Sequence, residues 1–174
     1  MLSNAEIAPA DLPAVDAVAW RPLDRRYARR LQVGAVLNAC VIGAGLLVLH
    51  GVEWQTGKDL PLWPGWAALA VIAASGLVWP LLSVPRKAWA VRERDVLYRS
   101  GLLWRTVSAV PFNRIQHVET ESTPLDRRFG LASLKLYTAG GTAGDLRIHG
   151  LTADVAERMR VFVLERAGAA VERG

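Results

Sequence analysis

Residues 31–52 read LQVGAVLNACVIGAGLLVLHGV and contain no Asp, Glu, Lys or Arg. Residues 60–85 read LPLWPGWAALAVIAASGLVWPLLSVP and are equally free of these charges. A helix rises about 1.5 Å per residue, so either block is long enough to cross a hydrocarbon core of about 30 Å. We therefore expect a transmembrane helical hairpin over residues 20–85, with helices at about 31–52 and 62–84.

Two other interpretations of these blocks fit less well. Buried core helices of a soluble protein usually keep a polar stripe, and a chain of 174 residues offers little protein to cover two wholly apolar helices. A cleaved signal peptide begins close to the N-terminus behind positive charges, whereas residues 1–19 form an acidic tail. That tail contains Pro9, Pro13 and several small residues, and we expect it to be disordered.

Positive charge is concentrated on the outer flanks of the expected hairpin. The topology prediction depends on Arg25, Arg26, Arg29 and Arg30 before the first helix and on Arg86 and Lys87 after the second. Cationic flanks stay on the cytoplasmic side, so we expect a multi-pass protein of the cell (inner) membrane with both termini in the cytoplasm. Topology and attraction to anionic lipids explain these charges, and nucleic acid is not an expected partner.

From residue 86 onward, charges return and short β-type runs alternate with turn signals. We expect about six short strands there, with GGTAG at 140–144 as a hairpin turn. Residues 152–167 change to a helical period, with Thr152 as the N-cap and an apolar stripe of Val155, Met159, Phe162 and Val163. The predicted fold class is α+β: the hairpin, then a small antiparallel β-roll capped by a C-terminal helix over residues 86–170.

The stretch from Val110 to Gly141 carries a more specific signal. Its motifs, in order, are Pro111, Arg114-Ile115-Gln116, the RFGLA run of residues 128–132, and Thr138-Ala139-Gly140. This pattern resembles the bacterial PH-like (pleckstrin-homology-like) domain of YdbS-like membrane proteins. The resemblance implies a seven-stranded roll at the cytoplasmic membrane face without enzymatic activity. It also implies a scaffold or transport-accessory role, sometimes beside a larger protein with several such domains.

No residue set indicates catalysis or metal binding. His50, His117 and His149 lack the spacing of metal ligands, and Cys40 lies within the first apolar block. His117 shares a predicted strand face with acidic residues, which indicates a polar face rather than a nucleophilic site. GGTAG lacks the Lys-Ser/Thr that follows a phosphate-binding loop. We expect no catalytic residue, no cofactor and no metal, and we identify no small-molecule substrate.

Three arginines near the PLDRRFG turn allow two interpretations. Arg114 and Arg128 can satisfy turn carbonyls or pair with Asp126 and Glu119, which is the structural reading. Alternatively, Arg127 joins them on a rim that binds phosphate groups, because the planar guanidinium makes bidentate contacts. The candidate lipid or partner contacts are Arg114, Arg127, Arg128, Arg86 and Lys87.

Two hypotheses for function follow. The first is a membrane-anchored, non-enzymatic interaction or scaffold module at the cytoplasmic membrane face, which forms a homo-oligomer or binds another PH-like membrane protein. The second is a sensor of anionic lipid headgroups that uses the candidate arginines. Both hypotheses take membrane lipids as partners, and they differ in whether a protein or a headgroup occupies the exposed surface of the roll.

Overall fold

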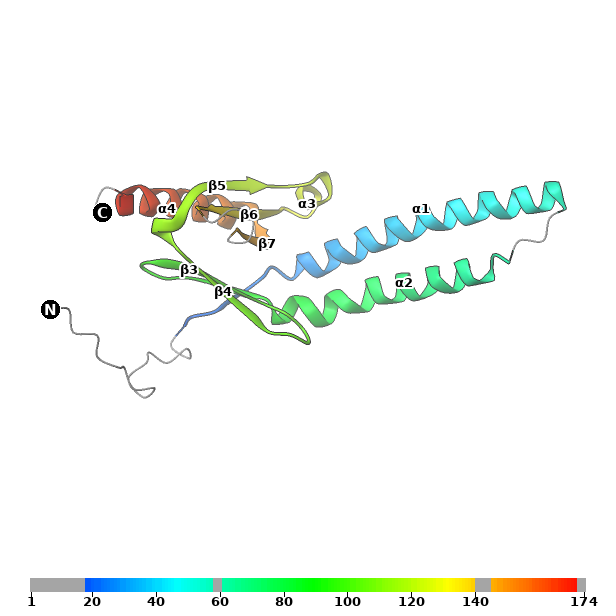
Figure 1. Cartoon of the computed structure of the whole chain (residues 1–174), viewed down its shortest axis with the longest axis horizontal. Helices are drawn as coiled ribbons and strands as arrows, with labels where there is room; N and C mark the ends of the chain where they lie inside the picture. Colours follow the sequence, from blue (N-terminus) through cyan, green and yellow to red (C-terminus); the bar gives the residue numbers. More distant parts are fainter. Residues whose placement is uncertain (1–17, 58–60, 140–144, 172–174) are drawn as a thin grey trace.

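The computed structural model describes residues 18–57, 61–139 and 145–171, so residues 1–17 of the acidic tail and the expected GGTAG turn lie outside the described residues. Helices α1 (Arg26–Thr56) and α2 (Trp63–Ser83) lie side by side as a hairpin that extends away from the rest of the chain (Figure 1). Both helices are long and apolar enough to cross a bilayer. Helix α1 begins before the apolar block, because residues 26–30 continue it toward the roll.

Small residues allow the two helices of the hairpin to approach closely. A Cβ atom at Gly76 of α2 would lie 2.6 Å from the Cβ atom of Ala35 in α1. Nearby, the side-chain amide of Gln32 donates a hydrogen bond to the carbonyl of Leu77 at 2.9 Å. Close backbone approach and interhelical hydrogen bonds are typical of helix pairs in membranes, where apolar burial gives little drive for association.

The rest of the chain folds into two antiparallel sheets whose buried side chains share one core. The first sheet has the order β1 (Arg21–Pro22), β2 (Ala88–Val91), β3 (Asp95–Ser100) and β4 (Thr106–Pro111). The second has the order β5 (Ile115–Glu121), β6 (Leu131–Thr138) and β7 (Leu146–Thr152). The connecting helices are η3 (Val84–Arg86), η4 (Phe112–Arg114) and α3 (Pro124–Arg128). These sheets, with helix α4 (Ala153–Val171) packed on them, confirm the α+β prediction.

Helix α4 closes the roll with a face slightly rotated from the expected stripe. The buried face consists of Ala156, Met159, Val163 and Ala167. Val155 and Phe162, expected in the stripe, are only partly buried because they lie at the edge of this face. The backbone N–H of Val155 donates to Oγ1 of Thr152 at 3.3 Å, which confirms the predicted N-cap. Full burial of a side chain such as Val163 contributes about 1.5–3 kcal/mol to stability.

Residues just before α1 and in its first turn also belong to the roll, which differs from the expected division at residue 86. Strand β1 pairs with β2, with Arg21 opposite Trp89. Leu23 and Tyr27 are only 5% and 8% exposed and lie in the same core as the strands. A strand of two residues is too short to show an alternating pattern, and the neighbouring arginines indicated only a membrane flank.

Strand directions give the roll two distinct ends along the long axis of the molecule (Figure 1). Strand β1 leads into α1, and β2 runs antiparallel to it, away from the hairpin. The β2–β3 turn at residues 92–94 therefore lies at the far end of the roll. The β3–β4 turn at residues 101–105 and helix α3 lie at the end that faces the hairpin.

Candidate functional site

An ion pair ties helix α1 to the roll. Nε of Arg30 donates to Oδ1 of Asp126 in α3 at 2.6 Å, and the two side chains are 22% and 11% exposed. The same guanidinium donates to Oγ1 of Thr123 at 3.2 Å. Beside this pair, a Cβ atom at Gly34 would lie 3.7 Å from the side chain of Leu125. Helix α3 thus packs directly on the first turns of α1, and the ion pair holds the roll against the base of the hairpin.

The local sequence of α3 prepares Asp126 for this contact. Thr123 and Asp126 form a capping box, in which the backbone N–H of Asp126 donates to Thr123 Oγ1 at 3.1 Å and the backbone N–H of Thr123 donates to Asp126 Oδ2 at 3.0 Å. Burial opposes ionisation of the carboxyl, but the hydrogen bonds from Thr123 and Arg30 outweigh burial and hold the pKa of Asp126 below its usual value. The aspartate is therefore an anion positioned for the arginine of α1.

A second contact between α1 and the roll involves two stacked rings. Tyr27 stacks on His149 with 6.2 Å between ring centroids and planes 4° apart. Gly150 permits this approach, because it has φ +70° and a Cβ atom there would lie 2.5 Å from Cγ of Tyr27. Nδ1 of His149 is 3.0 Å from Oγ of Ser133. Burial and the positive charge of Arg147 lower the pKa of His149 to about 4, so the ring is neutral near pH 7.

The structure separates the three arginines that the sequence analysis grouped together. Arg127 and Arg128 are exposed on α3 at the hairpin end, whereas Arg114 is exposed just before β5, at the opposite end of that strand (Figure 1). A strand of seven residues spans about 20 Å. Arg127 donates a hydrogen bond to the carbonyl of Ser122 at 3.1 Å. The three guanidinium groups therefore do not form a single phosphate site.

The two carboxylates expected to pair with these arginines have other partners. Asp126 binds the arginine of α1 described above. Glu119 accepts hydrogen bonds from two side chains on its own sheet, Tyr137 at 2.9 Å and His117 at 3.1 Å. Asp126 and Glu119 thus both accept hydrogen bonds, but from Arg30, Tyr137 and His117 rather than from Arg114 or Arg128.

The remaining predicted cationic residues lie where the hairpin meets the roll. Arg86 ends η3 and donates to the carbonyl of Leu82. Nζ of Lys87 lies 5.9 Å from the ring centroid of Tyr27, and burial lowers the pKa of this lysine. The exposed arginines at the start of α1 and just before it are Arg25, Arg26 and Arg29. Positive charge therefore surrounds the base of the hairpin.

The histidines and the cysteine are dispersed over the fold. His50 and Cys40 are on α1, His117 is on β5 and His149 is on β7. Within residues 18–57, 61–139 and 145–171, no three His, Cys, Asp or Glu side chains gather in a way that could hold a metal ion. What the described surface does offer is a groove.

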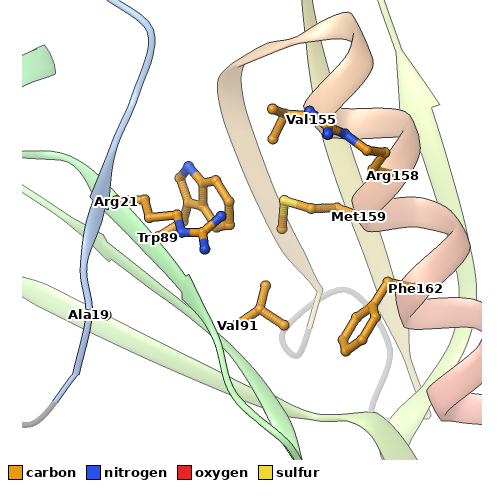
Figure 2. Close-up of a pocket in the computed structure, with 8 residues that line it drawn as sticks. All are labelled: Ala19, Arg21, Trp89, Val91, Val155, Arg158, Met159 and Phe162. Carbon is orange, nitrogen blue, oxygen red and sulfur yellow. The ribbon is translucent and has the colours of Figure 1, made fainter.

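This groove, of about 470 Å³, lies between the β1–β2 edge of the first sheet and helix α4 (Figure 2). Its apolar lining consists of Trp89, Val91, Val155, Met159 and Phe162, with Ala19 at one border. Two arginines flank the lining on opposite sides. The guanidinium of Arg21 lies 5.3 Å from the ring centroid of Trp89, and Arg158 pairs with Asp154 on α4. An open apolar groove of this kind can hold an apolar segment, and Arg21 at its border can meet a carboxylate of that segment.

The sequence analysis predicted neither the groove nor the contact of Arg30 with Asp126, which we call the joint between the hairpin and the roll. One wall of the groove depends on the pairing of β1 with β2, for which the sequence gives no periodic signal. The joint connects Arg30 and Asp126 across 96 positions of the chain. The sequence does show Arg30 just outside the first apolar block and a capping box at Thr123 and Asp126. Neither feature identifies the other as its partner.

Comparison with known proteins gives two matches. A family model described as bacterial PH domain matches residues 28–167. The UPF0699 transmembrane protein YdbS of Bacillus subtilis (strain 168) is 30% identical to this chain over 105 residues, which are 56% of this chain and 64% of that protein. The match therefore spans slightly less than two thirds of the relative's length. No solved structure matches.

Proposed function

Because this chain belongs to the bacterial PH domain family and is a transmembrane protein with two candidate spans, we propose that it is a membrane-anchored interaction module rather than an enzyme. The module assembles with a second copy of the chain or with another PH-like membrane protein. The contact is made by the groove between β2 and α4. Family membership supports the fold and the anchor, and the groove supports the assembly.

The chemistry of the groove carries this proposal. Val91, Val155 and Phe162 remain partly uncovered although the core beside them is tightly closed. Arg21 and Arg158 flank these side chains (Figure 2). A protein segment with apolar and acidic side chains fits the groove, because it covers the apolar lining while a carboxylate meets Arg21 and another competes with Asp154 for Arg158.

A second copy of the chain carries a segment of this kind. Residues 1–17 read MLSNAEIAPADLPAVDA, with Glu6, Asp11 and Asp16 and no Lys or Arg. Along the sequence, this segment is followed by Ala19 and Arg21, which line the groove. Exchange of these segments between two copies uses the same surfaces twice, as in a two-fold symmetric dimer.

The base of the hairpin supports a fixed placement of this module on the cytoplasmic face. The start of α1 and the end of α2 both lie at the roll (Figure 1), so the roll and both cationic flanks share one side of the membrane. Because cationic flanks favour the cytoplasmic side, our proposal has the groove in the cytoplasm as well. The Arg30–Asp126 pair limits rotation of the roll relative to the hairpin.

Site-specific crosslinking in native membranes tests the proposal. Benzoylphenylalanine replaces Val91 in the groove of the full chain, and a matched control replaces Thr120, which is exposed on β5. Two differently tagged copies should give an adduct of dimer mass from the groove position alone, and deletion of residues 1–17 should remove it. An adduct with a different membrane protein would support the module with another partner. Equal labelling at both positions, or none, would overturn the proposal.

Lipid headgroup binding is a second candidate, favoured by the exposure of Arg127 and Arg128 at the hairpin end. The full chain is needed for its test, because Leu23 and Tyr27 belong to the core of the roll. Arg127→Gln with Arg128→Gln should lower the amount of anionic lipid that copurifies with the protein. Arg114→Gln, at the far end of β5, is the matched control and should leave that amount unchanged.

A further inference from the structure

The β3–β4 turn presents two large apolar side chains to solvent. Leu103 is 80% exposed and Trp104 is 86% exposed. Other exposed apolar side chains of the described roll, such as Val107 at 48%, are covered to a much greater extent. Such exposure of apolar surface is costly in water unless the side chains contact a partner. We call this turn, residues 101–105, the apolar tip, and its exposure indicates that it contacts a partner.

The backbone of the apolar tip forms a tight turn with a defined conformation. Gly101 has φ +116°, and a Cβ atom at this position would lie 1.6 Å from the carbonyl oxygen of Trp104. The strands are paired up to Ser100 and Thr106, immediately before and after the turn. Only glycine at residue 101 allows this backbone to close. The paired strands therefore hold the two apolar side chains at a fixed place.

That place is the end of the roll that faces the hairpin (Figure 1). At the same end, Leu125 of α3 packs beside Gly34, which lies inside the apolar block of α1. This contact shows that the hairpin end of the roll lies at the level where the apolar part of α1 begins. The apolar tip extends along the long axis past the last turn of α2 (Figure 1).

We propose that the apolar tip inserts into the interface of the same membrane that α1 and α2 span. Trp104 suits the boundary between headgroups and acyl chains, where its ring is buried and its N–H stays hydrated. Leu103 adds apolar area beside it, and Arg105 can extend to lipid phosphates. The roll would then have a third point of attachment besides its two helices. This inference goes beyond the proposed assembly and does not depend on the groove.

The charges around the turn favour lipid over a protein partner. Arg99 and Arg105 are the charged residues nearest to the apolar tip along the chain. The acidic residues of the same sheet, Glu93 and Asp95, lie at its far end, where Asp95 pairs with Arg92. An apolar tip with cationic neighbours, at the same end of the roll as two candidate membrane helices, matches the composition of a surface that contacts anionic lipid.

A single environment-sensitive label tests this proposal in the full chain. Cys40→Ser removes the one cysteine, and Trp104→Cys then accepts a nitrobenzoxadiazole label in vesicles of phosphatidylcholine and phosphatidylglycerol. The control is Glu93→Cys in the β2–β3 turn, which is also exposed but lies at the far end of the roll. We expect blue-shifted, severalfold brighter emission at position 104, with quenching by lipids that carry a nitroxide near the headgroup. Emission at position 93 should resemble that of the label in water.

Two outcomes would overturn the proposal. Water-like emission at position 104 would show that the apolar tip stays outside the membrane. Blue-shifted emission without quenching by labelled lipid, retained when amphipol replaces the vesicles, would assign the apolar tip to a protein contact. Leu103→Cys provides a second reporter that leaves Trp104 in place. Crosslinking through Val91 is measured separately, so failure of one proposal is distinguishable from failure of the other.

Discussion

The joint between Arg30 and Asp126 should couple the hairpin to the roll energetically. A double-mutant cycle with Arg30→Gln, Asp126→Asn and the double variant isolates this pair from the other contacts of each residue. The cycle is needed because Asp126 also belongs to the capping box with Thr123. Both substitutions remove the charge and leave a polar amide in its place; Asp126→Asn keeps the size of the side chain, whereas Arg30→Gln shortens it.

The geometry sets the expected size of the coupling. Exposed ion pairs contribute about 0.2–1 kcal/mol, whereas hydrogen bonds to charged groups contribute about 1.5–3 kcal/mol. The N–O distance is 2.6 Å, and the side chains of Arg30 and Asp126 are 22% and 11% exposed, which places this pair between the two classes. We expect a coupling free energy of about 1–2 kcal/mol. Asp126→Asn should cost more than Arg30→Gln, because it also weakens the cap.

Urea unfolding of the roll provides the assay. The full chain in detergent micelles is followed by tryptophan fluorescence, since Trp89 is buried in the roll and becomes exposed on unfolding. A parallel cycle at the exposed Asp154–Arg158 pair of α4 is the control, and its coupling should be close to zero. A coupling at Arg30–Asp126 no larger than in this control would refute the idea that the pair joins the two parts.

Two further predictions concern the contact between Tyr27 and β7. The pKa of His149 falls from about 6.5 unfolded to about 4 folded, so the unfolded chain binds more protons between these values and stability should fall as pH drops from 6.5 to 4. His149→Gln should flatten this part of the urea-midpoint profile, and an unchanged slope would contradict it. Gly150→Ala should destabilise the roll by more than about 1 kcal/mol, since alanine meets a left-handed backbone and the Tyr27 ring. The control Gly168→Ala has open space in α4 and should leave the midpoint unchanged or raise it.

The features that the sequence predicted are those with a local pattern. The charge-free blocks indicated the hairpin, and the change of period after residue 151 indicated α4 with Thr152 as its cap. The motifs between residues 110 and 141 indicated the family, which the match over residues 28–167 confirms. Each of these signals lies within one element or one short stretch, where spacing and residue type are sufficient.

The features that the sequence did not predict depend on distant pairings. Strand β1 is too short for a period, and its register opposite Trp89 becomes visible only in the folded sheet. The arginines of the candidate site were grouped because they are close in sequence, but β5 separates Arg114 from the two arginines of α3. Exposure of the apolar tip was also hidden, because Leu103 and Trp104 resemble ordinary strand residues until the turn at Gly101 is known.

The position of β1 ahead of the first helix has a consequence for how the protein is made. Its strand partner, β2, follows both helices in the sequence and therefore leaves the ribosome after them. The nascent N-terminal strand must therefore wait, and the sheet can close only if the chain has returned to its starting compartment. A chain with an odd number of crossings would leave β1 and Tyr27 on the wrong side, with the core of the roll unfilled. The roll can therefore fold completely only when both helices are inserted correctly. A misinserted chain would expose an incomplete core to proteolysis.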